Sequence, residues 1–225
     1  ETVQREGVTE HLLKREGELA RLNINEFVID ERGFIGQVVD ISDDQLVIKD
    51  LHQHDLMNEE VWGLVPRDIY QAMALHLLLD PDIHLVNLTG SAGSGKTILA
   101  LAACIEMTVA SKMYKRIIAT RSTQGLDEDI GFLPGTEAEK MEPWLGAITD
   151  NLEALHLEDE NCRSSVEYVL EKVPLMFKSL NYIRGRSFQS SLIIIDESQN
   201  LTPHQIKTIV TRAGNGSKVI CLGNL

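Results

Sequence analysis

The chain has 225 residues, of which 43% are hydrophobic and 24% charged, and its formal net charge at pH 7 is −13. This length and composition suit one globular α/β domain with room for a small appendage. The acidic balance argues against a broad nucleic-acid-binding surface, which is usually basic, but it leaves room for a local one. No run approaches about 18 consecutive apolar residues, so we expect no membrane-spanning helix.

The cysteines and the first residue indicate the cellular context of the chain. Cys104, Cys162 and Cys221 are far apart and lack the spacing of metal ligands. We interpret them as small core residues in a reducing compartment, which indicates a cytoplasmic protein. The chain begins at Glu1 without a methionine and has no signal peptide, so we expect it to be a piece of a longer protein.

The first segment of the chain, residues 1–24, is polar and carries its leucines at helical spacing. These leucines are Leu12, Leu13, Leu19 and Leu22. A helix brings such positions to one side, so the spacing predicts a helical connector over residues 1–24.

The next segment, residues 25–60, changes character and favours a small β-meander subdomain. Short apolar runs at 27–29, 34–39 and 46–49 are expected to be its strands, with a turn at Gly33. Three strands form a sheet too small to stand alone, so the meander must pack on something.

Residues 61–225 alternate predicted strands with predicted helices. The strands are expected at 83–88, 116–120, 192–196 and 218–222. The helices are expected at 66–79, at 98–107, at 137–155, and from the cap formed by Thr202, Pro203 and Gln205. This alternation predicts an α/β fold, a mostly parallel sheet with helices on both faces. Such a sheet normally continues beyond a fourth strand, so we expect its C-terminal edge to be missing after Leu225.

A glycine-rich loop follows the first of these strands. It consists of Gly90, Ser91, Ala92, Gly93, Ser94, Gly95, Lys96 and Thr97, which match G-x-x-x-x-G-K-[ST] at every fixed position. Strand, loop and helix are the context that this pattern demands, so we predict a RecA-like P-loop NTPase. Backbone N–H groups of such a loop surround a phosphate. Lys96 would reach the β- and γ-phosphates, and the Thr97 hydroxyl would hold Mg²⁺.

Two adjacent acids follow the third predicted strand. Asp196 ends an aliphatic run, which places it at the carboxyl end of a buried strand beside the phosphate loop. There it can bind Mg²⁺ directly or through water. Glu197 can polarise the attacking water as a general base. The pair therefore favours hydrolysis over simple nucleotide binding, with ATP and Mg²⁺ as the expected cofactors.

Three further polar residues indicate how the site is used. Residues 196–199, Asp-Glu-Ser-Gln, resemble the Asp-Glu-x-Gln motif of superfamily 1 helicases, in which the residue matching Gln199 couples the γ-phosphate to the nucleic-acid side. Asn224 ends the fourth strand, where such proteins sense the state of the nucleotide. Gln71 resembles the adenine-reading Gln of the same helicases, because a Gln amide pairs with the N6 donor and the N7 acceptor of adenine. Tyr70 and Trp62 are candidates to stack on the base.

These residues belong to a set of motifs that resembles the PhoH family of P-loop ATPases over residues 60–225. The other motifs are TRS at 120–122, GFLPG at 131–135, KMEPW at 140–144, YIRGRS at 182–187, DESQN at 196–200 and TRAG at 211–214. The resemblance implies ATP-dependent RNA helicase activity, single-stranded RNA as a partner and a hexameric ring. The meander resembles the link to a PIN domain in the two-domain branch, which implies an RNase (PIN) domain in the full-length protein. Asn224 departs from the pattern, because many members have Asp there.

Hydrolysis of ATP usually needs a cation on the charge that develops at the γ-phosphate, often supplied in trans. The candidates are Arg121, Arg184, Arg186 and Arg212. Gly185 separates two of them and suits close approach to an anion, so we prefer Arg184 and Arg186 as the catalytic residues. Arg121 and Arg212 stay candidates for sensing or coupling. The same arginines can instead pair with an acidic helix or contact an RNA backbone.

Three classes of function are compatible with these features. An RNA-stimulated ATPase motor working in a ring explains Gln199, Asn224 and the need for arginines in trans. The alternative is a regulatory or assembly ATPase that acts on a protein partner without binding nucleic acid, with the acidic segment at 137–155 as its docking face. A small-molecule kinase is disfavoured, because no arginine-rich lid is visible and Glu197 suits water better than a metabolite hydroxyl.

Overall fold

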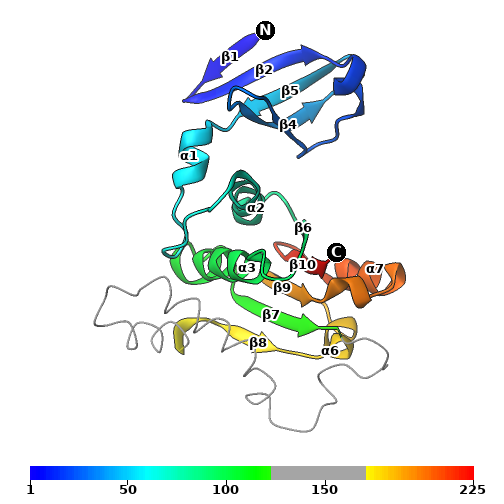
Figure 1. Cartoon of the computed structure of the whole chain (residues 1–225). Helices are drawn as coiled ribbons and strands as arrows, with labels where there is room; N and C mark the ends of the chain where they lie inside the picture. The colour runs from blue at the N-terminus through cyan, green and yellow to red at the C-terminus, as the bar shows by residue number, and fades with distance from the viewer. Residues whose placement is uncertain (123–170) are drawn as a thin grey trace, which may run out of the picture. The chain divides into compact units, whose positions relative to one another are not determined.

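The computed structural model describes residues 1–122 and 171–225 of the chain (Figure 1). They form two compact units, Glu1–Glu59 and Glu60–Leu225, which are described in turn. Outside the described residues lie the helix expected at 137–155, Cys162, and the motifs at 131–135 and 140–144.

The N-terminal unit is a five-stranded antiparallel sheet followed by a short helix. Its strands are β1 (Thr2–Arg5), β2 (Val8–Lys14), β3 (Phe27–Ile29), β4 (Ile35–Ile41) and β5 (Gln45–Asp50), in the order β1-β2-β5-β4-β3. The helical segments are the 3-10 helix η1 (Gly17–Arg21) and the α-helix α1 (Gln53–Asn58). The three strands expected in the meander are present as β3, β4 and β5, within this larger sheet.

The helical connector expected over residues 1–24 is wrong, because this segment contains β1 and β2. Leu13 on β2 lies opposite Leu46 on β5, so it packs across a sheet and not along a helix. A better signal was the pair Glu6 and Gly7 between the two strands. Both residues have positive φ angles, 50° and 81°, which a two-residue hairpin turn requires.

The C-terminal unit is an α/β fold built on a five-stranded parallel sheet. Its strands are β6 (Leu85–Gly90), β7 (Arg116–Arg121), β8 (Leu175–Phe177), β9 (Ser191–Asp196) and β10 (Lys218–Asn224), in the order β6-β10-β9-β7-β8. The four expected strands are confirmed as β6, β7, β9 and β10. The short strand β8 was not predicted, because three apolar residues give no recognisable period.

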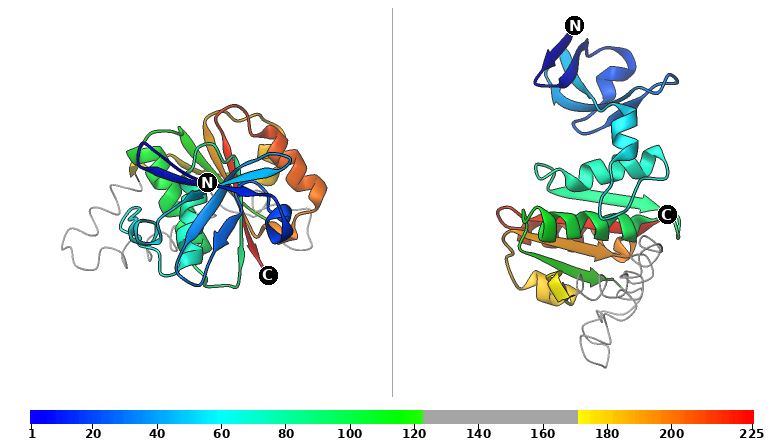
Figure 2. Two further views of the ribbon diagram at one scale, coloured as in Figure 1. Left: turned by 90° about the horizontal axis from the view of Figure 1, so that it is seen from above. Right: turned by 90° about the vertical axis from the view of Figure 1, so that its left-hand side faces the viewer.

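Helices cover both faces of this sheet (Figure 2). They are α2 (Ile69–Leu79), α3 (Lys96–Ile105), α6 (Leu180–Arg184) and α7 (Pro203–Arg212), with the π-helix η2 (Glu106–Ala110) and the 3-10 helix η4 (Ser198–Asn200). The expected cap of α7 is confirmed, since Thr202 and Gln205 form a capping box. None of the helices in the described part of the chain has the length and hydropathy needed to cross a bilayer.

Burial on both faces explains the continuous aliphatic strand β9. Its residues Leu192 and Ile194 belong to the core that α2 and α3 cover. The alternate residues Ile193 and Ile195 belong to the core under α6 and α7. All four are 0% exposed. A strand that is buried on both faces must be apolar at successive positions. The aliphatic run of β9 therefore ends at Asp196, its first charged residue.

Lys218, at the start of β10, is a buried lysine that fastens α2 to the sheet. Its side chain is fully buried, and its Nζ donates to the backbone oxygens of Leu77, Leu78 and Asp80. The last carbonyls of a helix lack partners within it and carry the negative end of its dipole. The ammonium group therefore satisfies these carbonyls and complements their charge.

We predict that Lys218→Met destabilises the fold by about 3 kcal/mol, because three carbonyls at the end of α2 lose a charged donor. Thermal or urea unfolding measures the loss. The matched control is Lys207→Met, which removes an exposed lysine from α7 and should change stability by less than about 0.5 kcal/mol. Equal unfolding midpoints for the two variants would contradict the structural role of Lys218.

Candidate functional site

The glycine-rich loop joins β6 to α3 and depends on its glycines for conformation and for space. Gly93 and Gly95 have φ angles of 77° and 89°, in the left-handed region. A Cβ on Gly95 would lie 3.1 Å from Nε2 of Gln71, and a Cβ on Gly90 would lie 3.1 Å from Oγ of Ser94. Glycine at 93 and 95 therefore adopts the left-handed conformation without strain, and glycine at 90 and 95 leaves room for Ser94 and Gln71, which suits a backbone cradle for phosphate.

Lys96 begins α3 and turns its side chain back over the loop. Its Nζ donates to the backbone oxygens of Gly90 at 2.9 Å and Ser91 at 2.8 Å, and to Oγ of Ser94 at 3.3 Å. Thr97 follows in the first helical turn and is half-buried. The positive end of the α3 dipole and the ammonium group of Lys96 therefore both lie at the phosphate loop, where they favour binding of an anion.

A row of residues from four strands continues across the carboxyl edge of the sheet. On the face that α3 covers, the apolar positions nearest this edge are Leu88, Leu222, Ile194 and Ala119. Two residues further along the same strands lie Gly90, Asn224, Asp196 and Arg121. Because side chains alternate along a strand, the side chains of Asn224, Asp196 and Arg121 point to the face of the sheet that carries the phosphate loop and α3.

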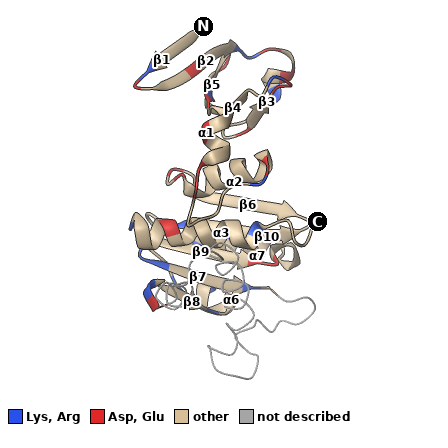
Figure 3. Ribbon diagram, turned by 60° about the vertical axis from the view of Figure 1, so that its left-hand side comes forward, with Lys and Arg blue, Asp and Glu red and all other residues tan. Residues whose placement is uncertain are grey.

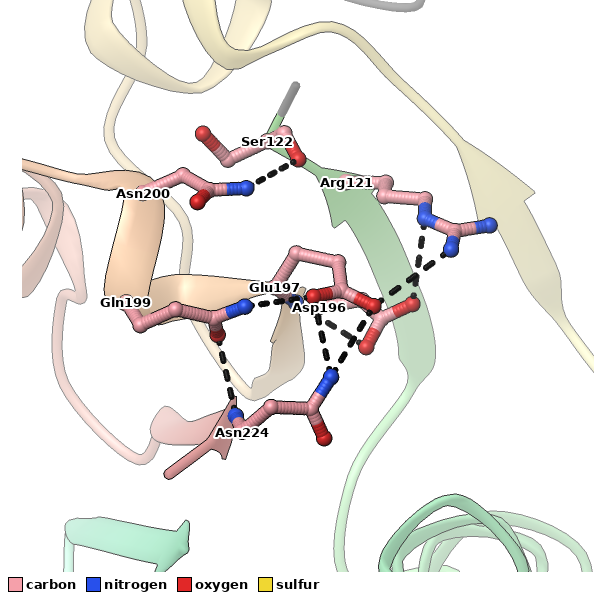
Figure 4. A network of polar contacts seen from close by, with 7 residues as sticks. All are labelled: Arg121, Ser122, Asp196, Glu197, Gln199, Asn200 and Asn224. Carbon is pink, nitrogen blue, oxygen red and sulfur yellow. Dashed lines mark hydrogen bonds and ion pairs between the residues drawn. The ribbon is translucent and has the colours of Figure 1, made fainter. Parts of the chain in front are cut away.

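The two acids at this edge lie beside Arg121 (Figure 4). Nε of Arg121 is 3.5 Å from Oδ2 of Asp196, and Nη2 is 3.4 Å from Oε1 of Glu197. Burial raises the pKa of the Asp196 carboxyl above its ordinary value, and the positive charge of Arg121 opposes this rise. The arginine therefore compensates two carboxylates that would otherwise repel each other.

Glu197 has an unusual backbone conformation and a closely held carboxylate. Its φ and ψ are 53° and 40°, in the left-handed region that costs free energy for a non-glycine residue. Nε2 of Gln199 donates to Oε2 at 2.6 Å, and Nδ2 of Asn224 lies 3.2 Å from Oε2 and 3.5 Å from Oε1. The backbone N–H of Asn224 in turn donates to Oε1 of Gln199 at 3.0 Å. The predicted acid, sensor and coupling residues thus form one network.

Two residues that entered the sequence interpretation only as members of motifs also belong to this network. The backbone N–H of Ser122 donates to the backbone oxygen of Asp196 at 3.1 Å. Nδ2 of Asn200 donates to the backbone oxygen of Ser122 at 3.3 Å. Their only sequence signal was that they directly follow Arg121 and Gln199.

Gln71 lies against the loop, near the place where an adenine reader is expected. Its Nε2 donates to the backbone oxygen of Ser94 at 3.3 Å, and its Oε1 accepts from the N–H of Arg67 at 2.9 Å. Tyr70 beside it is 72% exposed, whereas Trp62 packs against the core. Recognition of adenine by Gln71 and stacking by either ring stay predictions.

Arg184, Arg186 and Arg212 are not brought to this network. Cζ of Arg186 lies 4.4 Å from the ring of Tyr182, which lies 6.0 Å from the ring of Phe188. The N–H of Phe188 bonds to the backbone oxygen of Arg212 at 3.1 Å, shortly before β9 begins. Phe188 and Arg212 therefore lie near the start of β9, at the end of that strand opposite the acids. Nη1 of Arg184 contacts Oδ1 of Asn181 at 3.5 Å. Action of these arginines from a neighbouring subunit stays a prediction.

The oxygen donors of the site suit a triphosphate with Mg²⁺. The hydroxyl of Thr97 and the carboxylate of Asp196 are hard donors, and Mg²⁺ typically binds one or two such protein oxygens together with phosphate and water. Within residues 1–122 and 171–225, no group of three or more His, Cys, Asp and Glu side chains is placed to hold a metal by itself. A metal ion here would therefore depend on the nucleotide.

Comparison with known families decides the identity of the fold. A family model described as "PhoH-like protein" matches residues 63–225, which include the phosphate loop and the acid pair. The chain belongs to the PhoH-like protein family. The family resemblance drawn from the motifs is thereby confirmed.

Similar proteins are longer than this chain. "Protein PhoH2" of Bacillus subtilis is 42% identical over 204 residues, which are 89% of this chain and 45% of that protein. "Protein PhoH2" of Mycolicibacterium smegmatis is 38% identical over 164 residues, 72% of this chain and 36% of that protein. The chain spans less than half the length of these relatives. Among solved structures, the assembled type III secretion ATPase EscN of enteropathogenic E. coli covers 100% of the chain at a TM-score of 0.31 and 11% identity, and 69% of EscN is covered. A score this low carries no argument.

We predict that Gly95→Ala weakens nucleotide binding about tenfold, because a left-handed alanine costs about 1–2 kcal/mol. Its Cβ would also press on Nε2 of Gln71 at 3.1 Å. Equilibrium binding of a fluorescent ATP analogue measures the effect. The matched control is Gly185→Ala, where φ is −81° and the nearest contact of a Cβ is an ordinary 3.6 Å. Equal affinities for the two variants would refute the geometric requirement.

Proposed function

We propose that this chain is an ATPase that binds and hydrolyses ATP with Mg²⁺, and that single-stranded RNA stimulates hydrolysis, as in an RNA helicase motor. The observation that supports it most directly is the row at the carboxyl edge of the sheet. That row joins the phosphate loop to Asp196, the candidate metal ligand, on the face that α3 covers, and Glu197, the candidate base, directly follows Asp196. Phosphate binding, metal binding and water activation are thus available in one place.

Each residue of the site has a separate role in this proposal. Backbone N–H groups of the loop and Lys96 bind the phosphates, while Thr97 and Asp196 hold Mg²⁺. Bound there, Mg²⁺ would neutralise charge on the β- and γ-phosphate oxygens. Glu197 accepts a proton from the attacking water, and Gln199 keeps its carboxylate in place.

The distribution of charge supports RNA as the partner (Figure 3). From residue 171 to the last residue, the basic side chains that are not buried are Lys172, Lys178, Arg184, Arg186, Lys207 and Arg212, and the acids are Glu171 and the two of the site. The ring of Tyr182 lies 5.2 Å from Nζ of Lys178 and 4.4 Å from Cζ of Arg186. Cations around an aromatic ring suit a phosphate backbone and its bases. A local RNA surface is therefore compatible with the acidic net charge.

The full-length assembly is also part of the proposal. The chain covers only 45% of the Bacillus subtilis PhoH2 protein, which leaves room for the RNase (PIN) domain that the sequence motifs imply. We place such a domain in the same full-length chain and the ATPase in a hexameric ring. Because Arg184 and Arg186 contact Asn181 and Tyr182 and not the acids of their own chain, we assign them to the nucleotide of a neighbour in the ring.

The first catalytic prediction concerns Glu197→Gln. This variant keeps the size and polarity of the side chain, so ATP binding should persist, while turnover should fall about 10²–10⁴-fold through loss of the base. Lys96→Ala should instead lose ATP binding. Phosphate release and binding of a fluorescent ATP analogue separate the two effects. Normal turnover by Glu197→Gln would show that another group activates water.

The second prediction concerns RNA. Addition of single-stranded RNA should raise the rate of ATP turnover, and the stimulation should weaken with salt, since contacts with phosphate are salt-dependent. Assays at low and moderate ionic strength, with and without an oligonucleotide, measure this. The absence of stimulation at both salt concentrations would favour the alternative, an ATPase that acts on a protein partner; nucleotide-dependent assembly without RNA retention would support the same alternative.

A further inference from the structure

The carboxylate of Glu197 is held by four contacts, two on each oxygen. Its Oε1 accepts from Nη2 of Arg121 at 3.4 Å and from Nδ2 of Asn224 at 3.5 Å. Its Oε2 accepts from Nε2 of Gln199 at 2.6 Å and from Nδ2 of Asn224 at 3.2 Å. A carboxylate offers about four lone-pair sites, and these four contacts occupy them. Loss of one donor would therefore leave an oxygen of Glu197 more open to water.

The lengths of the contacts indicate which oxygen is released. Both contacts of Oε1 are longer than both contacts of Oε2, so Oε1 is held more weakly. Gln199 and Asn224 also fix each other, through the N–H of Asn224 and Oε1 of Gln199. Arg121 has a different second contact, Oδ2 of Asp196 at 3.5 Å, and its side chain is 39% exposed. Of the three side chains that donate to Glu197, Arg121 is the one that also pairs with Asp196.

We propose that Arg121 is a gate on the acid pair. Its guanidinium neutralises Asp196 and Glu197 together, and it leaves when the Asp196 carboxylate binds Mg²⁺, which frees Oε1 of Glu197 for the attacking water. The inference rests on the proposed ATPase function. Arg121 is a positioning residue in this mechanism, and it makes the availability of the base depend on occupation of the metal site.

Simple electrostatics supports the exchange. A guanidinium group and a divalent cation repel each other when they share one carboxylate, so binding of one weakens binding of the other. The backbone next to Arg121 is held in place by Ser122. The N–H of Ser122 donates to the backbone oxygen of Asp196, and the backbone oxygen of Ser122 accepts from Nδ2 of Asn200. Rotation of the partly exposed Arg121 side chain is sufficient.

The test measures how much Mg²⁺ strengthens binding of a fluorescent, non-hydrolysable ATP analogue, as the ratio of affinities in Mg²⁺ and in EDTA. Arg121→Gln removes the competing charge, so this ratio should rise about tenfold above that of the unchanged protein. Arg121→Lys keeps a charge that cannot bridge both acids, so its ratio should rise about threefold. Lys14→Gln removes an exposed charge from β2 and should leave the ratio unchanged.

A ratio for Arg121→Gln equal to or below that of the unchanged protein would overturn the gate. Thermal unfolding of each variant shows whether it is folded. If Arg121→Gln does not fold, Arg121→Lys decides, and an unchanged ratio overturns the proposal. The proposed ATPase function fails separately, if the unchanged protein releases no phosphate from ATP, so the two failures are distinguishable.

Discussion

Parallel hydrogen bonding between β6, β10, β9 and β7 is the constraint on which the candidate site depends. Because these strands run in one direction, all their carboxyl ends meet at one edge of the sheet. This edge gathers Gly90, Arg121, Asp196 and Asn224, which are widely separated in the sequence. A shift of one residue in any register would turn the side chain of that strand toward α7 instead of α3. The aliphatic cores on the two faces prevent such shifts, because they fix which residues point each way.

The same edge also balances charge. Asp196 lies at the end of a strand buried on both faces, and desolvation raises the pKa of its carboxyl. Arg121, the backbone N–H of Glu197 and Lys96 oppose this rise in pKa, whereas the charge of Glu197 adds to it. Two cations and two anions are thus held close together at the boundary between core and solvent. A site of this composition tolerates an incoming polyanion and a divalent cation only if its internal ion pairs rearrange, and this requirement motivates the gate at Arg121.

Much of the site was predictable from sequence because its signals are local. The phosphate loop is one continuous motif, and the acid pair directly follows an aliphatic strand, so neither depends on contacts between distant segments. The positions of Arg184 and Arg186 were not predictable in this way. They follow β8, whose place at the far edge depends on strand order, a property that no local pattern encodes. Residues 1–24 misled because leucines at helical spacing obscured the Glu6–Gly7 turn.

The buried ammonium of Lys218 has a mechanical consequence. It fastens the last turn of α2 to the start of β10, while Gln71 in the first turn of α2 touches the phosphate loop at Ser94. The same strand β10 carries Asn224 at its other end. Lys218 therefore connects the helix that carries Gln71 to the strand that carries Asn224, through three hydrogen bonds from one ammonium group. The residue beside the phosphate loop and the residue beside the acids thus belong to two elements that a single buried side chain holds together.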